Sequence, residues 1–247
     1  MRCDAAFHKH CKCFKDCNHD PIGGNVRFFV LEPVGGIRFG TKWAYAEKVE
    51  PVLLGETHVC PICGQAISLL EWLPPHRIKL SSAKPEKWGD FLWGGTFLAV
   101  SERLKEIYHA EGLSGIECFY PPAEIVRVGT RKSGDLPKSL PVYSAVSIKW
   151  NGANLDDEMS GIVRRPGKLV CSFHRGWIQS LERIGLETAS WDGSDIFIAR
   201  GGLNSATIVS ERFRDVIEKH ALTNAWLIPA ENYAYREIGG WYVRDPS

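Results

Sequence analysis

The feature that most constrains the fold of this 247-residue chain is a sequence pattern that occurs twice. The segment Val100-Ser-Glu-Arg-Leu-Lys-Glu-Ile is matched by Val209-Ser-Glu-Arg-Phe-Arg-Asp-Val, with four identities and four conservative changes. Leu113 and Leu222 follow the two segments at the same spacing of 109 residues. A pattern that recurs in this way indicates two copies of one structural unit, so two similar halves are expected.

Further features recur in the same order around both segments. In the first copy they are Asp90, Gly94-Gly95 and Pro122-Ala123-Glu124, and in the second Asp195, Gly201-Gly202 and Pro229-Ala230-Glu231. Between the copies lies the polar stretch 130–141, whose glycine and two prolines are typical of a surface connection. We therefore expect one α+β repeat at residues 26–130 and a second at residues 141–247, each large enough for its own core.

Each copy contains one amphipathic helical pattern. Ser101 and Ser210 are candidate N-caps, and Glu102 and Glu211 place negative charge in the first helical turn. Gly112 lies where a helix C-cap is expected. Short aromatic and β-branched runs predict strands at residues 27–31, 91–93, 116–120, 142–150, 195–199, 225–228 and 240–243. The expected fold is therefore α+β, with two tandem duplicated halves and one main helix in each.

Composition excludes some classes of protein and indicates a compartment. Hydrophobic residues make up 44% of the chain, which is typical of a folded domain and argues against general disorder. Lys and Arg number 30 and Asp and Glu 29, whereas nucleic-acid-binding proteins usually carry a clear basic excess. The sequence has neither a membrane-length apolar stretch nor the apolar core of a signal peptide, so we expect a cytoplasmic protein. Thiols stay reduced there, and closely spaced cysteines are interpreted first as metal ligands.

The N-terminal segment differs from the rest of the chain. Residues 1–25 contain four cysteines and three histidines but few apolar residues, and they end in a Pro-Ile-Gly-Gly breaker cluster and Asn25. We expect a disordered or leader segment, because nothing in it can form a core. The alternative is a small second metal site.

The best-defined chemical motif is a pair of cysteines in a zinc-knuckle pattern, Cys60-Pro-Ile-Cys63-Gly64. One knuckle supplies two of the four ligands of a tetrahedral site. At a spacing of 111 residues the second half carries Cys171 and His174, again separated by two residues. We predict one Zn²⁺ per chain bound by Cys60, Cys63, Cys171 and His174. Four protein ligands leave no open position, so the site is expected to be structural and to join the two halves.

The same residue types also suit other roles. A redox dithiol at Cys60 and Cys63 is disfavoured because no βαβ pattern accompanies it. His58 or His76 is the alternative to His174 as the fourth ligand. Cys118 lies in an apolar run and is expected to be a buried core thiol. His109 and His220 fall on or near the predicted helices and are expected at the surface.

The cysteine motif, its partner about 110 residues later and an opening that ends in Leu31-Glu32-Pro33 resemble the double-CXXCG motif family. This paralogous family is abundant in myxobacteria, and its members include immunity proteins that neutralise contact-dependent toxins such as those of the Sit system. The resemblance covers most of residues 26–235. The chain departs from the family at the second motif, where His174 replaces a cysteine and Arg175 stands where glycine is expected. Histidine can replace cysteine as a Zn²⁺ ligand, so the metal site is retained in principle.

The sequence is compatible with three functions. The first, implied by the resemblance, is an immunity protein that binds a cognate protein toxin, without catalytic residues, a small-molecule substrate, a membrane or nucleic acid. The second is a zinc-containing nucleic-acid-binding or regulatory module, which the near-neutral charge disfavours. The third is a zinc hydrolase, which a site with four protein ligands disfavours. The sequence contains no GxSxG, HExxH, P-loop or dinucleotide-binding motif, so we expect no enzyme.

Overall fold

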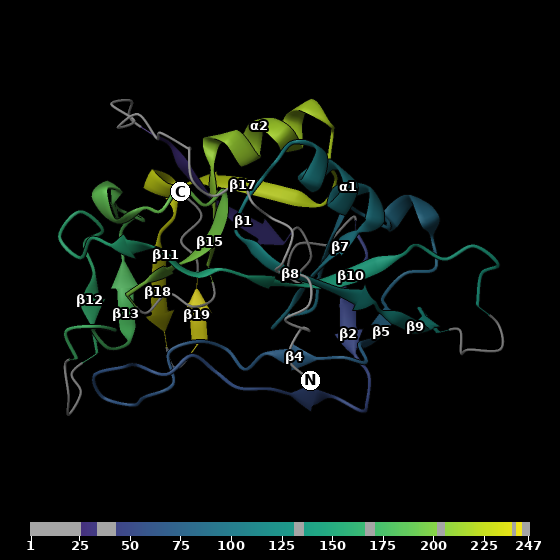
Figure 1. Ribbon diagram of the computed structural model, residues 1–247, viewed down its shortest axis with the longest axis horizontal. Helices are drawn as coiled ribbons and strands as arrows, with labels where there is room; N and C mark the ends of the chain where they lie inside the picture. Colours follow the sequence, from purple (N-terminus) through teal and green to yellow (C-terminus); the bar gives the residue numbers. More distant parts are fainter. Residues whose placement is uncertain are drawn as a thin grey trace, which may run out of the picture.

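The computed structural model describes residues 26–33, 43–130, 136–165, 171–201, 206–238 and 241–243. Within these residues the fold is mixed α+β, with two α-helices, α1 (Glu102–Ala110) and α2 (Glu211–Lys219), and many short strands (Figure 1). Neither helix has the length and apolar character needed to cross a membrane. The expectations for residues 1–25 fall outside the described part of the chain. The described residues also contain 3₁₀ turns at Pro85–Lys87, Thr188–Ser190 and Ala230–Asn232.

The largest sheet has six strands in the order β14-β11-β15-β16-β1-β17. Its second strand from one edge is β1, which comes from the N-terminal end of the described chain and pairs antiparallel with both β16 and β17. The N-terminal strand therefore completes a sheet made otherwise of C-terminal strands. The bounds are β14 Leu186–Glu187, β11 Trp150–Leu155, β15 Ile196–Arg200, β16 Thr207–Ser210, β1 Phe28–Pro33 and β17 Ala225–Pro229.

A four-stranded sheet has the order β6-β7-β10-β8. Here β10 follows the connection at residues 130–141 but lies between two strands that precede it, antiparallel to both. Tyr143 of β10 is paired with Ser101, as Phe28 of β1 is paired with Ser210. The strand that begins each expected half thus lies in the sheet of the other. The bounds are β6 Phe91–Trp93, β7 Leu98–Ser101, β10 Tyr143–Ile148 and β8 Ile116–Pro122.

Three smaller sheets flank these two. One has the order β12-β13-β18-β19, one β2-β5-β9, and the pair β3-β4 forms the base of an arm that spans residues 55–71. The arm runs along the lower edge of the molecule in blue (Figure 1). The bounds are β12 Val163–Arg164, β13 Ile178–Leu181, β18 Tyr235–Ile238, β19 Trp241–Val243, β2 Ala46–Lys48, β5 Arg77–Leu80, β9 Glu124–Val128, β3 Leu53–Leu54 and β4 Trp72–Leu73.

Both predicted helix starts are confirmed. The Ser101 hydroxyl accepts a hydrogen bond from the Leu104 N–H at 3.1 Å, and the Ser210 hydroxyl accepts one from the Phe213 N–H at 3.2 Å. Such caps satisfy backbone donors that have no partner within the helix. After the first helix, Gly112 adopts a φ of 61°, as predicted for a residue just past a helix end.

The two helices share one core. Leu104 and Tyr108 of α1 lie in the same buried cluster as Phe213 and Val216 of α2, and Phe29 of β1 packs among them. Figure 1 shows α1 and α2 next to each other above the sheets. Burial of a large apolar side chain contributes about 1.5–3 kcal/mol, so this shared cluster is a major part of the fold's stability.

The run predicted as one strand at residues 142–150 is two strands, and this prediction was wrong. β10 ends at Ile148 and β11 begins at Trp150, and the two belong to different sheets. Between them Lys149 donates its N–H to the Gly115 carbonyl and accepts from the Ile198 N–H, both at 2.8 Å. Asn151 then adopts a positive φ of 69°. The backbone therefore turns from one sheet into the other at Lys149, although the residue types suit a continuous strand.

Candidate metal centre

The first cysteine pair lies in a tight turn of the arm. Val59 and Ala66 form an antiparallel bridge that closes the turn, and the Cys60 N–H donates to the Gln65 carbonyl at 2.8 Å. The Gly64 N–H donates to the Cys60 carbonyl at 2.9 Å, with Gly64 at a φ of 72° that glycine adopts without strain. The sequence after the second cysteine therefore suits the turn that holds both sulfur atoms.

The turn around the second pair has the same hydrogen bond and a similar positive φ, but the residue at that position is Arg175 instead of glycine. The Arg175 N–H donates to the Cys171 carbonyl at 2.8 Å, as Gly64 does to Cys60, and Arg175 adopts a φ of 59°. The left-handed region costs a non-glycine residue roughly 1–2 kcal/mol. The guanidinium group offsets this cost, since it donates to the Leu155 carbonyl at 2.8 Å and to Glu187 at 2.9 Å. Arg175 thus adopts the left-handed conformation that Gly64 adopts in the first turn, and its side-chain hydrogen bonds stabilise it there.

The two turns bring all four predicted ligands together. Cys60 Sγ lies 3.4 Å from Cys171 Sγ, and Cys63 Sγ lies 3.6 Å from His174 Nδ1. The four ligand atoms all lie within 4.8 Å of one another. With Zn–S near ~2.3 Å and Zn–N near ~2.0–2.1 Å, a tetrahedral site places its ligand atoms roughly 3.5–3.8 Å apart. The cluster could therefore hold a metal ion.

Two of the four residues in the cluster are closed to solvent, and Cys63 and His174 are partly exposed. Cys60 and Cys171 are only 2% and 6% exposed and pack with Ile67, while Trp150 and Phe173 cover the cluster from the side. The thiols are free rather than joined in disulfides. An apolar shell of this kind strengthens the attraction between thiolates and a cation and restricts the access of water.

Local hydrogen bonds distinguish the thiols. The pKa of Cys171 is lowered, chiefly because the backbone N–H groups of His174 and Phe173 donate to its sulfur. The pKa of Cys63 is raised: the backbone N–H of Gln65 lowers it, but burial and the neighbouring Cys60 and Cys171 together raise it more. Cys171 therefore ionises more readily than Cys63.

The alternative fourth ligands lie elsewhere. The ring of His58 stacks on Trp150, with ring centroids 5.5 Å apart, and is not part of the ligand cluster. His76 is buried, and its Nε2 lies 2.9 Å from the Trp72 carbonyl oxygen. Burial is the main reason that the pKa of His76 is lowered. His174 therefore completes the cluster, whereas His58 and His76 belong to aromatic contacts.

The remaining cysteine and histidine predictions have mixed outcomes. Cys118 is half-buried against the core rather than fully buried. His109 is exposed, as predicted, and packs against the ring of Phe119. His220 was expected at the surface; it is partly buried, and its Nε2 lies 2.6 Å from Glu111 Oε1. Glu111 and His220 are 109 residues apart, the same spacing that separates Leu113 from Leu222.

Two buried aspartates connect the helix starts to the opposite helix ends. Asp90 accepts hydrogen bonds from Ser101 and Arg103, both at 2.8 Å, and from the Thr223 N–H at 2.9 Å. Asp195 makes the matching contacts, with Ser210 and Arg212 at 2.8 Å and the Ser114 N–H at 3.0 Å. Each carboxylate is fully engaged by these donors. These contacts link the start of each helix to the loop that follows the other helix.

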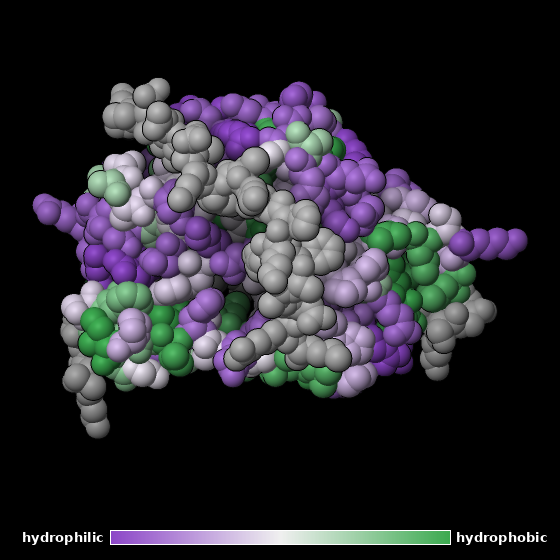
Figure 2. Space-filling view, viewed as in Figure 1, coloured by the Kyte–Doolittle hydropathy of each residue, from purple (hydrophilic) through white to green (hydrophobic). Residues whose placement is uncertain are grey.

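Exposed apolar side chains surround the metal centre. Val59 and Ile62 flank the first cysteine pair and are 59% and 63% exposed, and Trp177, three residues after His174, is 63% exposed. The space-filling view shows hydrophobic surface gathered at the lower left, where the arm ends beside β12 (Figure 2). Contiguous exposed apolar surface is typical of protein-interaction sites. Val59, Ile62 and Trp177 therefore form exposed apolar surface next to the two ligand pairs.

Comparison with known proteins identifies no family. The sequence matches no protein-family model and no curated protein.

Proposed function

We propose that this chain is a cytoplasmic immunity protein of the double-CXXCG type, which neutralises a cognate toxin by direct protein–protein binding and is not an enzyme. One observation carries the proposal: four protein ligands close the metal centre, and the exposed side chains of Val59, Ile62 and Trp177 surround it. A saturated site has no position for water or substrate, so its role is to hold the two ligand turns in place. The turns then present their apolar residues to the partner.

The proposed metal is a single structural Zn²⁺. Three sulfur ligands and one imidazole nitrogen suit Zn²⁺, whereas hard cations prefer oxygen. Because the two ligand pairs come from turns 111 residues apart, the ion joins distant parts of the chain. Structural zinc sites in small modules contribute about 10–16 kcal/mol of apparent binding free energy, so loss of the ion is expected to destabilise the arm.

The proposal includes the tandem duplication. Support comes from the matched networks around Asp90 and Asp195, and from the matched positions of β1 and β10. In each network an aspartate binds the cap and the arginine of one helix and the loop that follows the other helix. The ancestral unit is then a homodimer whose subunits exchanged their first strands, and a later fusion produced one chain with one metal site.

The test is protection of a cell that expresses the candidate toxin encoded beside this chain. The wild-type chain should rescue growth and co-elute with the toxin in size-exclusion chromatography. Trp177→Ser should lose rescue while zinc content and melting temperature stay unchanged. Trp226→Ser is the matched control, since this exposed tryptophan lies on β17, away from the arm.

Other outcomes would redirect the assignment. A wild-type chain that neither rescues growth nor forms a complex contradicts the immunity function for that toxin. Salt-dependent DNA binding favours a nucleic-acid module. A hydrolytic activity that is lost on metal removal from protein that stays folded favours a hydrolase.

A further inference from the structure

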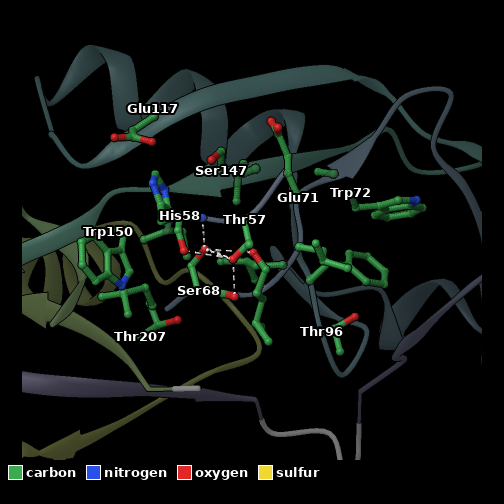
Figure 3. Close-up of a pocket in the computed structure, with 18 of the residues that line it drawn as sticks. Thr57, His58, Ser68, Glu71, Trp72, Thr96, Glu117, Ser147, Trp150 and Thr207 are labelled. Atoms are coloured by element: carbon green, nitrogen blue, oxygen red, sulfur yellow. Dashed lines mark hydrogen bonds between the residues drawn. The ribbon is translucent and has the colours of Figure 1, made fainter. Parts of the chain in front are cut away.

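A cavity of about 480 Å³ lies between the arm and the four-stranded sheet that contains β7, β8 and β10. Figure 3 shows its residues converging from both sides, with Trp150 at one end and Trp72 at the other. The volume falls within the range of roughly 300–1,000 Å³ that is usual for ligand sites. The cavity is separate from the metal centre, although Trp150 contacts both.

The chemistry of the walls is aromatic and acidic. Trp72, Phe97 and Trp150 supply apolar faces, and the ring of His58 stacks on Trp150 with an interplanar angle of 21°. The carboxylates of Glu56, Glu71 and Glu117 line the cavity as well. None of the described lining residues is Lys or Arg. The walls therefore favour a positively charged ligand with an apolar stem.

Two of the carboxylates are available to such a ligand. Glu56 and Glu117 are exposed and form no ion pair with any other described residue. Glu71 differs, because it accepts a hydrogen bond from the Tyr120 hydroxyl. Glu117 lies at the upper rim in Figure 3, opposite the Thr57–Ser68 side of the arm.

The aromatic wall already binds one cation. Lys48 Nζ lies 4.9 Å from the ring centroid of Trp72 and 5.5 Å from that of Phe97. Both distances are within the ~6 Å range of cation–π attraction. Lys48 is not among the lining residues, so it leaves the cavity volume free and its positive charge only partly offsets the three carboxylates.

We propose that this cavity binds an Arg or Lys side chain of a protein partner. The stem packs against the aromatic wall of the cavity, and the charged head lies near Glu56 and Glu117. A protein is the favoured source because exposed Leu69 and Leu70 of the arm line the same cavity and continue it as open apolar surface. A partner chain covers such surface, whereas a small cation does not. The inference rests on the proposed protein-binding function and adds the chemistry of the contact.

The test titrates full-length protein with acetyl-arginine methylamide and acetyl-lysine methylamide, and follows the indole N–H resonances by ¹H–¹⁵N NMR. Acetyl-norleucine methylamide is the uncharged probe of similar shape. The cationic probes should shift the Trp150 and Trp72 resonances, while the norleucine probe should leave them unchanged. The Glu56→Gln/Glu117→Gln double variant should weaken binding about fivefold, as expected for partly exposed charges. Glu106→Gln, at an exposed position of α1, is the matched control and should bind as wild type.

Each contrary result has a distinct meaning. Equal binding of the norleucine probe, or unchanged binding in the double variant, overturns the cation site. Free arginine that binds more than tenfold tighter than the blocked form assigns the cavity to a small molecule and overturns the protein source. Growth rescue by the double variant at wild-type level overturns the contact while the immunity function stands. Failure of the wild-type chain to rescue overturns the immunity function, and the probe titration still decides the cation site.

Discussion

At the scale of single residues, Cys60, Cys63, Cys171 and His174 are fixed by backbone geometry more than by contacts between their side chains. Each turn is closed by an N–H that donates back to the first cysteine's carbonyl, from Gly64 in one case and Arg175 in the other. The cysteine spacing and the 111-residue offset were enough to predict which four side chains form this cluster. The support given to Arg175 by Glu187 and the Leu155 carbonyl was not visible there, because it comes from strands distant in sequence.

The first residue-scale prediction concerns metal content. Cys171→Ser should lower bound zinc from about one ion per chain to well below half, because a hydroxyl is a poor ligand for Zn²⁺. Elemental analysis of purified protein measures this directly. Cys118→Ser is the matched control, because Cys118 lies outside the cluster. This variant should retain the full zinc content. Full zinc in Cys171→Ser would show that the ion does not bind between the two turns.

The second residue-scale prediction separates backbone strain from ion pairing at Arg175. Arg175→Gly removes the strain of a φ of 59° but also the ion pairs with Asp157 and Glu187, so its stability should stay close to wild type. Arg175→Ala loses the ion pairs and keeps the strain. The alanine variant should be less stable than the glycine variant by about 1 kcal/mol. Urea unfolding of both variants measures this, and an alanine variant as stable as the glycine variant would contradict a strained backbone.

At the scale of elements, the helices show what local sequence can specify. Ser101 and Ser210 cap their helices as predicted, because a cap involves only the next three residues. The sequence predicted that Asp90 and Asp195 occupy matching positions, but it did not predict their hydrogen-bond partners. Their partners lie across the molecule, since Asp90 binds Thr223 and Asp195 binds Ser114. Local patterns therefore locate the elements, while the contacts that join elements depend on the tertiary fold.

The element-scale prediction concerns the matching contacts of Asp90 and Asp195. Asp90→Asn and Asp195→Asn should each lower the free energy of unfolding by about 1.5–3 kcal/mol, because each weakens charge-assisted hydrogen bonds at a buried site. The two losses should be similar, since the networks match. Asp215→Asn is the control, because its ion pair with Arg214 is exposed and should contribute less than about 1 kcal/mol. Urea denaturation gives all three values, and a cost confined to one aspartate would argue against equivalent junctions.

At the scale of the whole molecule, β1 and β10 connect the two parts of the chain, because each strand lies in a sheet formed mainly by the other part. The sequence predicted two halves that could each own a core, and it predicted strands near Phe28 and Tyr143. It could not predict their partners, because antiparallel pairing is set by burial and sheet geometry and not by a local motif. In the fold, β1 lies between β16 and β17, and β10 lies between β7 and β8. Each sheet is therefore incomplete without a strand from the other half.

This arrangement predicts the behaviour of separated fragments. Fragment 26–130 lacks β10 and fragment 141–247 lacks β1, so each leaves two strand edges unpaired and part of the shared helix core exposed. Neither should unfold cooperatively alone, whereas the two expressed together should form a one-to-one complex with one zinc ion. The measurements are near-ultraviolet circular dichroism, size-exclusion chromatography and elemental analysis.

Metal removal from that complex distinguishes the contribution of the metal site from that of the exchanged strands β1 and β10. A chelator takes away only the contribution of the four ligands, so the fragments should remain associated through the exchanged strands, with a lower melting temperature. Replacing Val30 with Asp in fragment 26–130 places a charge on a fully buried strand position and should abolish association even with zinc present. The control is Glu47→Gln, at an exposed position of β2, which should leave association intact. Dissociation by the chelator alone would show that the metal, and not the strand exchange, holds the two halves together.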